Sequence, residues 1–153
     1  MAFELSSPGF KEGDSIPRRY TCEGENVSPP LHWGVPPAAT KSFVLIADDP
    51  DAPGGTWVHW VLYNLPLDLR GLSEAVPAKE QVLDGAIHGL TDFKRIGYGG
   101  PCPPPGKPHR YYFKLYALDV VLDLKPRATK AQVLEACKGH VLAEAQLMGR
   151  FGR

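Results

Sequence analysis

The sequence has no long hydrophobic segment, no excess of charge of either sign and few cysteines. No stretch approaches the ~18 apolar residues that a membrane-spanning helix needs, and the first residues lack the charged and apolar regions of a signal peptide. Lys and Arg together number 17, as do Asp and Glu, so the formal net charge is zero. A broad basic surface for nucleic acid is therefore absent. We expect a protein with no transmembrane segment and no nucleic-acid partner.

The three cysteines, Cys22, Cys102 and Cys137, are widely spaced, and none belongs to a Cys-x-x-Cys pair. This spacing argues against a disulfide framework and against a zinc ribbon, and it makes a reducing compartment the default. We therefore predict a cytoplasmic location. A single bridge between two of the three cysteines stays compatible with the spacing.

The chain length of 153 residues suits one domain covering residues 1–153. Hydrophobic residues make up 43% of the chain, which is enough for a proper core. Gly and Pro number 16 each. So many turn-forming residues predict tight turns and irregular loops, and they argue against a helical bundle.

Three segments have the length and composition of buried β-strands: 42–47, 57–65 and 111–118. Loops rather than crossover helices separate them, which favours a sandwich of two antiparallel sheets over a parallel α/β sheet. After Thr129, a predicted N-cap, apolar residues recur at helical spacing. We expect two short peripheral helices that are broken near Gly139, or a single kinked helix.

An acidic loop at 48–56 connects the first two of these strands and carries three carboxylates within four positions. Pro50 and Pro53 flank Asp51 and restrict the backbone, so the loop is suited to holding a carboxylate in one orientation. A merely rigid turn is the alternative interpretation. The Ala52–Pro53 bond is a candidate for the cis form.

His59 lies within an otherwise apolar strand, where a buried polar side chain needs a partner. One interpretation is a structural histidine that bonds a backbone carbonyl. The other pairs His59 with a carboxylate of the acidic loop, which would favour the imidazolium and direct a donor at an anion.

The segment 97–108 is built almost entirely from Gly and Pro, which supply nine of its twelve residues. Glycines allow backbone N–H groups to turn toward a ligand, so the segment suggests an amide cradle for a small anion. It lacks the Gly-x-x-x-x-Gly-Lys-Ser/Thr pattern of nucleotide-hydrolysing proteins. Next in the chain, His109 and Tyr111 project from one strand face, whereas Arg110 points the other way and is expected to pair with a carboxylate.

The candidate groups comprise two histidines, a tyrosine hydroxyl, glycine amides and the acidic loop. Because donors outnumber acceptors, the expected ligand is a phosphate, a phosphate ester or a carboxylate.

Several ordered motifs resemble the phosphatidylethanolamine-binding proteins, in particular the short bacterial and archaeal branch of Raf kinase inhibitor protein-like (YbhB/YbcL) proteins. The motifs are Asp-Pro-Asp-Ala-Pro at 49–53, Trp-x-His-Trp at 57–60, Gly-Gly-Pro-Cys-Pro-Pro at 99–104, His-Arg-Tyr at 109–111, Ser-Pro-Pro-Leu-x-Trp at 28–33 and the segment from Gly139-His140. The resemblance covers nearly the whole chain. It implies a β sandwich of two antiparallel sheets with peripheral helices, and a cis proline in the acidic loop.

The resemblance also implies a small pocket that binds phosphate-type anions, including phospholipid head groups, and a protein partner such as a protein kinase. The ligand-binding residues expected from the motifs and the resemblance together are Asp49, Asp51, Pro53, Trp57, His59, Gly100, Pro101, His109 and Tyr111. No cofactor and no resident metal are expected, and a homodimer is compatible with the composition.

We expect binding rather than catalysis, because no Gly-x-Ser-x-Gly elbow is present and no Ser or Cys adjoins either histidine. Three alternatives stay open. A weak hydrolase of phosphate or carboxylic esters would use His59 and His109 as acid and base. A metal site would join the same histidines with Asp49, and Cys102 is the best candidate for a nucleophile.

Overall fold

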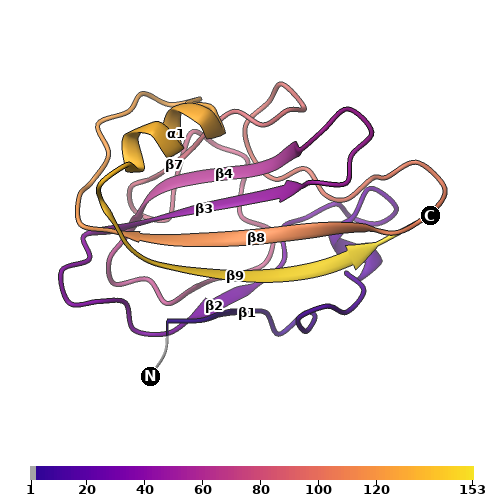
Figure 1. The fold of residues 1–153 in the computed structure, drawn as a ribbon, viewed down its shortest axis with the longest axis horizontal. Helices are drawn as coiled ribbons and strands as arrows, with labels where there is room; N and C mark the ends of the chain where they lie inside the picture. The colour runs from indigo at the N-terminus through magenta and orange to yellow at the C-terminus, as the bar shows by residue number, and fades with distance from the viewer. Residues whose placement is uncertain (1–2) are drawn as a thin grey trace.

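A six-stranded antiparallel sheet forms the centre of the computed structural model, which describes residues 3–153 (Figure 1). Its strands lie in the order β6 (Gln81–Val82), β7 (Ala86–His88), β4 (Trp57–Pro66), β3 (Ser42–Asp49), β8 (His109–Leu118) and β9 (Val141–Phe151). The three strands predicted from the sequence are β3, β4 and β8, and they are neighbours in the middle of this sheet.

A smaller antiparallel sheet covers one face of the large sheet. It consists of β1 (Leu5–Ser6), β2 (Leu31–Trp33) and β5 (Gly71–Leu72). Its buried side chains pack against those of β3 and β4, and the rings of Trp33 and Phe43 meet at 5.5 Å between centroids. The predicted sandwich of two antiparallel sheets is confirmed.

Strand β3 is buried on both faces, which explains its continuous apolar run. Phe43 and Leu45 face the small sheet, whereas Val44 and Ile46 face the helix α1 (Lys130–Cys137) and the segment that precedes it. Truncating such a fully buried aromatic side chain to alanine costs about 3–5 kcal/mol. The position of β3 is therefore fixed by packing from both sides.

The predicted pair of C-terminal helices is only half correct. Helix α1 begins after Thr129, whose side chain forms a capping box with Gln132, as the N-cap prediction required. The chain from Val141 to Phe151 is the edge strand β9, which pairs with β8 along almost its whole length. Inward-facing and outward-facing residues alternate along β9, as in any strand. Two of the inward-facing residues are Ala143 and Ala145, which are weakly hydrophobic and favour helices, so the sequence pattern resembled a helix.

Two other expectations concern the cysteines and the peptide bond before Pro53. A disulfide joins Cys22 to Cys102, so the single bridge left open by the spacing exists, and Cys137 is a buried free thiol. All peptide bonds in residues 3–153 are trans, including Ala52–Pro53, so the expected cis proline is wrong.

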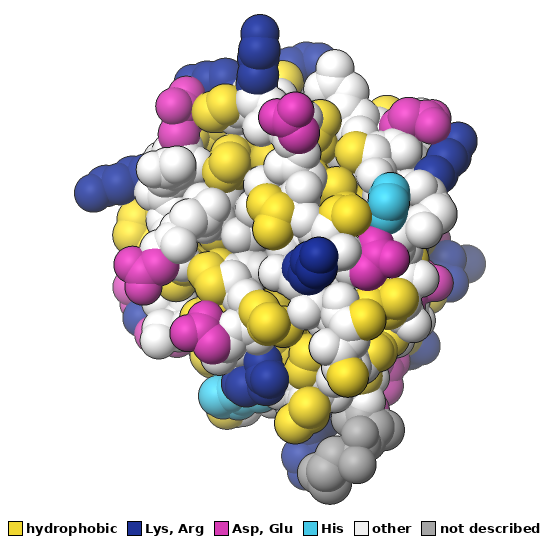
Figure 2. All heavy atoms as spheres, turned by 90° about the vertical axis from the view of Figure 1, so that its left-hand side faces the viewer, with side chains coloured by type: hydrophobic (Ala, Val, Ile, Leu, Met, Phe, Trp, Pro, Cys, Tyr) yellow, Lys and Arg dark blue, Asp and Glu magenta, His cyan; other side chains and the backbone are white. Residues whose placement is uncertain are grey.

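The end of the sandwich where β9 begins faces the viewer in Figure 2. Hydrophobic side chains are interspersed there with charges of both signs, so this face has no continuous field of one sign. Within residues 3–153, no helix has the length and apolar composition needed to cross a membrane.

Candidate functional site

A cavity of about 200 Å³ lies at the opposite end of the sandwich, where β3 ends and where β4 and β8 begin. Because the three strands are antiparallel neighbours, the end of β3 lies beside the starts of β4 and β8. The acidic loop, Trp57 and His109 therefore lie at the same end of the sandwich. The cavity is lined by Asp49, Ala52, Pro53, Trp57, His59, Phe93, Cys102, Pro103, Pro104, His109 and Tyr111. The structure thus brings together residues from all three segments singled out in the sequence.

His109, rather than His59, is the histidine paired with the acidic loop. Its Nδ1 lies 2.7 Å from Oδ2 of Asp49, and both side chains are largely buried. The backbone N–H of Asp51 donates to the other Asp49 oxygen at 2.7 Å. The Asp49 carboxylate is therefore held from two sides, and it fixes the orientation of the His109 ring.

His59 has the structural partner of the plainer interpretation. Its Nδ1 lies 2.6 Å from the carbonyl oxygen of Gly99, and because a carbonyl only accepts, Nδ1 carries the proton. Burial lowers the pKa of His59, so the ring is neutral near pH 7. Its Nε2 is consequently a hydrogen-bond acceptor on a ring that lines the cavity. The interpretation of His59 as a structural histidine is therefore confirmed, and the alternative of an imidazolium paired with a carboxylate is wrong.

A β-bulge brings His59 to the cavity. In the pairing of β3 with β4, Ala47 lies opposite Trp60 but the next residue, Asp48, lies opposite Val58, so His59 is the extra residue. Trp60 packs in the core between the sheets, and Val58 packs on the helix side. The bulge allows the neighbouring residues 59 and 60 both to face the interior of the sandwich.

Tyr111 provides the most distinctive polar atom of the cavity. The residue is 3% exposed, and its hydroxyl has no partner with hydrogen-bond geometry within residues 3–153, although the Asp49 carboxylate lies close enough to raise its pKa. Burial, with the negative charge of Asp49, raises the pKa of Tyr111, so the hydroxyl keeps its proton. A buried O–H donor without a partner is unfavourable by about 1–3 kcal/mol, which a ligand oxygen would relieve.

The glycine-rich segment does not form the predicted amide cradle. The N–H of Gly99 donates to the carbonyl of His59 at 3.0 Å, and the N–H of Gly100 donates to the Asn26 side chain at 2.8 Å. Gly100 is needed for packing, because a Cβ there would lie 2.3 Å from the carbonyl oxygen of Tyr20. Both amides are consumed within the protein, and neither Gly100 nor Pro101 lines the cavity.

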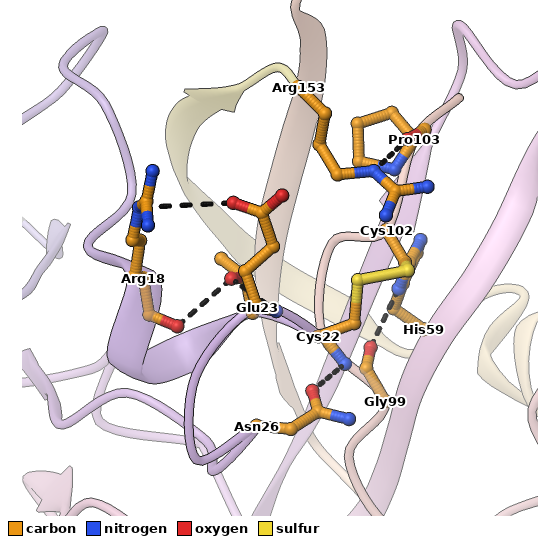
Figure 3. The surroundings of a disulfide bond; sticks show 11 residues. Arg18, Cys22, Glu23, Asn26, His59, Gly99, Cys102, Pro103 and Arg153 are labelled. Atoms are coloured by element: carbon orange, nitrogen blue, oxygen red, sulfur yellow. Dashed lines mark hydrogen bonds and ion pairs between the residues drawn. A yellow bond between two sulfur atoms is a disulfide. The ribbon is translucent and has the colours of Figure 1, made fainter. Parts of the chain in front are cut away.

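The Cys22–Cys102 disulfide instead makes this segment part of the cavity wall (Figure 3). Cys102 lines the cavity, and Cys22 anchors it to the N-terminal region, where the N–H of Cys22 also donates to the carbonyl of Pro101. With its sulfur in the bridge, Cys102 has no thiol, so its candidacy as a nucleophile is wrong.

Asp51 lies outside the cavity lining and pairs with Arg110. Two Arg110 nitrogens reach the two carboxylate oxygens at 2.8 and 2.9 Å. This pairing lowers the pKa of Asp51 to about 2. The expectation that Arg110 points away and binds a carboxylate is confirmed. Asp51, which was expected to bind the ligand, instead connects the acidic loop to β8.

Phe93 is a cavity residue that the sequence reasoning missed. Its ring lies edge-on to Trp57 and to His59, with centroids 5.6 and 5.3 Å away. The Asp92 side chain accepts a hydrogen bond from the N–H of Val58 and so fixes the loop that carries Phe93. No pattern around Phe93 distinguishes it from an ordinary loop aromatic. Ala52, Pro103 and Pro104 lie within the motifs singled out in the sequence, but they were not among the expected ligand-binding residues.

Within residues 3–153, no group of three His, Cys, Asp or Glu side chains is arranged to hold a metal ion. The alternative that joins both histidines with Asp49 therefore finds no support in the geometry. The remaining polar groups of the lining suit hydrogen bonding to an organic or inorganic anion.

Comparisons with known proteins cover the whole site. The family model "Phosphatidylethanolamine-binding protein" matches residues 6–152. A UPF0098 protein of Methanothermobacter thermautotrophicus is 54% identical over 149 residues, which are 97% of this chain and 98% of that protein. A UPF0098 protein of Aquifex aeolicus is 48% identical and covers 98% of this chain and 88% of its own.

Two crystal structures are similar over almost their full length. The putative phosphatidylethanolamine-binding protein homologue CT736 of Chlamydia trachomatis has a TM-score of 0.91 and 44% identity, with 99% of this chain and 98% of that chain covered. Escherichia coli YbcL, described as a new member of the mammalian family, has a TM-score of 0.93 and 33% identity, with 100% and 99% covered.

Proposed function

Because the chain belongs to the phosphatidylethanolamine-binding protein family, we propose that its cavity binds a small anion, either phosphate or a phosphate ester. The cavity of about 200 Å³ is smaller than the ~300–1,000 Å³ typical of pockets for drug-sized ligands. Family membership supports binding in general, and the choice of anion is our inference from the lining.

The buried Tyr111 hydroxyl is the single observation that carries the proposal. This hydroxyl offers an O–H donor to a ligand oxygen. The rings of Tyr111 and His109 are stacked, with 6.4 Å between their centroids. Asp49 is the partner of Nδ1 of His109, so Nε2 is the ring nitrogen left to bond a ligand. His59 Nε2 is an acceptor, so a ligand with one P–OH group matches the lining better than a fully ionised anion.

A titration with inorganic phosphate tests the proposal. Protein with ¹⁵N-labelled histidine is titrated at constant ionic strength, and the side-chain resonances are followed by NMR. We expect saturable shifts for His59 and His109 and none for His140, which lies at the other end of β8 and β9. Unchanged His59 and His109 resonances at millimolar phosphate would overturn the proposal.

Ester hydrolysis is the second candidate function, and one observation favours it. Asp49 orients His109 as a carboxylate orients a general base in hydrolases. Turnover of p-nitrophenyl phosphate or acetate that disappears in His109→Ala would establish it. No turnover above the buffer rate would leave binding as the function.

The further expectations about partners rest on the family resemblance. We propose that the protein modulates a protein partner such as a protein kinase, for which affinity capture with a catalytically active kinase as readout is the test. A homodimer is tested by sedimentation. We also propose a cytoplasmic location. The Cys22–Cys102 disulfide counts against it, because such bridges are rare in reducing cytosols outside hyperthermophiles.

A further inference from the structure

Arg153 lies against the wall of the cavity although it is not one of its lining residues. Its Nε donates to the carbonyl oxygen of Pro103 at 2.6 Å, and its own carbonyl accepts a hydrogen bond from the N–H of Gly106 at 3.2 Å. Figure 3 shows the guanidinium beside Pro103 and Cys102. The cavity-wall segment therefore holds residue 153 both by its side chain and by its main chain.

The neighbouring Gly152 allows this close approach. A Cβ at position 152 would lie 3.0 Å from the Cα of Pro108, which is tighter than ordinary contacts. The backbone that carries Arg153 is thus pressed against the segment that leads into His109. Arg153 is therefore placed by the same loop that forms the cavity wall.

In the described part of the chain, the cavity lining contains no permanently positive side chain, and Arg153 places a positive charge against its wall. No Lys or Arg is among the cavity-lining residues of the described chain, and the only permanent charge there is the Asp49 carboxylate. Arg153 forms no ion pair within residues 3–153, and its two terminal nitrogens donate no hydrogen bond there. Its positive charge acts on the Tyr111 hydroxyl, where it opposes the effect of burial on the pKa.

On the basis of the proposed function, we propose that Arg153 determines the specificity of the cavity. Its guanidinium binds the outer oxygens of a phosphate, and Tyr111 and His109 bind the inner oxygens. A guanidinium presents two parallel N–H groups that match two phosphate oxygens. A phosphate monoester or free phosphate has at least three unsubstituted oxygens, so it offers such a pair and still leaves an oxygen for the inner part of the cavity. A diester has a second substituent in place of one of these oxygens and has no P–OH group for His59, so the site selects monoesters against phospholipid-type diesters.

Methyl phosphate and dimethyl phosphate are the probes that separate these two classes. Isothermal titration calorimetry at pH 7.5 and fixed ionic strength gives both affinities for the wild type, Arg153→Ala, Arg153→Gln and Arg153→Lys. We expect the wild type to bind methyl phosphate at least about tenfold more tightly than dimethyl phosphate, since charge-assisted bonds contribute about 1.5–3 kcal/mol. In Arg153→Ala and Arg153→Gln the preference should fall to within about threefold, and Arg153→Lys should restore part of it.

Arg150→Ala is the matched control. Arg150 is an exposed arginine on β9 that lies opposite Arg110, on the strand face that points away from the cavity. It should keep the wild-type preference, although it loses the same charge.

Two results separate the failure of this inference from the failure of the proposed function. If the wild type binds methyl phosphate and the neutral variants keep its affinity and preference, the role of Arg153 is overturned and phosphate binding stands. If the wild type binds neither probe and its histidine resonances do not move, both are overturned. A preference of the wild type for dimethyl phosphate would also overturn the role of Arg153.

Discussion

Asp49 and His109 are 60 positions apart in the sequence and meet at 2.7 Å in the cavity wall. The same two residue types form a second pair, Asp119 with His140, at 2.8 Å. The first pair is largely buried, with side chains 4% and 12% exposed, and the second is exposed by 38% and 43%. The protein therefore contains its own comparison between a cavity pair and a surface pair.

His109→Ala should weaken phosphate binding by about 10–100-fold, because it removes a ring nitrogen that bonds the charged ligand, an interaction of about 1.5–3 kcal/mol. His140→Ala removes the same chemistry from the exposed pair and should leave the affinity unchanged. Calorimetric titration of both variants with inorganic phosphate checks this. Equal losses in the two variants would point to a general charge effect rather than to a site.

Tyr111→Phe should separate stability from binding. The substitution removes a buried hydroxyl that has no partner within residues 3–153, so the free energy of unfolding should stay the same or rise by about 1 kcal/mol. Phosphate affinity should fall by about 3–10-fold, the value of one neutral hydrogen bond.

Tyr63→Phe is the control for Tyr111→Phe. The Tyr63 hydroxyl donates to the carbonyl of Lys125 and accepts from the N–H of Ala128. Its loss should lower the free energy of unfolding by about 1–2 kcal/mol and leave phosphate binding unchanged. Urea unfolding and calorimetry measure the two quantities. A Tyr111→Phe variant that is as destabilised as Tyr63→Phe would show that the Tyr111 hydroxyl has a structural partner.

The stability of the protein should fall as the pH is lowered from 8 to 5.5. Burial lowers the pKa of His59 and of His88, whose Nδ1 bonds the Lys79 carbonyl and whose Nε2 accepts from the Trp60 indole. Each folded pKa lies below the unfolded value of about 6.5, so the unfolded state binds more protons in that window. The stabilisation is complete above about pH 6.5 and is lost as the pH falls toward the folded pKa, by at most about 1.4 kcal/mol per pH unit for each histidine.

Urea unfolding at several pH values checks this expectation. His59→Gln and His88→Gln should each reduce the slope of the free energy of unfolding below pH 6.5, whatever they do to its value at pH 8. The exposed His32→Gln serves as the control for the substitution itself. A slope unchanged in both buried variants would contradict the assignment.

Reduction of the Cys22–Cys102 bridge should destabilise the protein by about 4 kcal/mol, because the bridge closes a loop of 80 residues. Phosphate affinity should fall as well, since Cys102 is part of the cavity wall. Urea unfolding with and without dithiothreitol measures the effect. The double variant Cys22→Ala, Cys102→Ala should be insensitive to the reductant, whereas Cys137→Ala should remain sensitive.

The central strands could be predicted because their sequence pattern matches how they are buried. Phe43 to Ala47 is continuously apolar because β3 is covered on both faces. The second half of the C-terminal region could not be predicted, because Ala, Glu and Gln favour helices locally. Pairing of Ala143 and Ala145 with β8 outweighs that preference.

The site could be predicted as a set of segments but not as a set of contacts. Antiparallel neighbours must bring the end of one strand beside the start of the next, so the meeting of the acidic loop with His109 follows from topology. Which histidine receives Asp49 depends on side-chain direction within the last two residues of the strands. The positions of Phe93 in the cavity and of Arg153 against its wall depend on tertiary hydrogen bonds, such as those from Val58 to Asp92 and from Arg153 to Pro103.

The extra residue in β4 also sets how much change this edge of the sheet tolerates. Deletion of one residue at position 59 would restore a regular ladder and leave the strand from Trp60 onward in place. Ala47 would still lie opposite Trp60 and Asp48 opposite Val58, so the side chains on both sides of the deletion would keep their present faces. Shortening the strand by one residue would therefore remove the His59 imidazole from the cavity and leave Trp57 in its wall, so the irregularity in the ladder serves the cavity rather than the sheet.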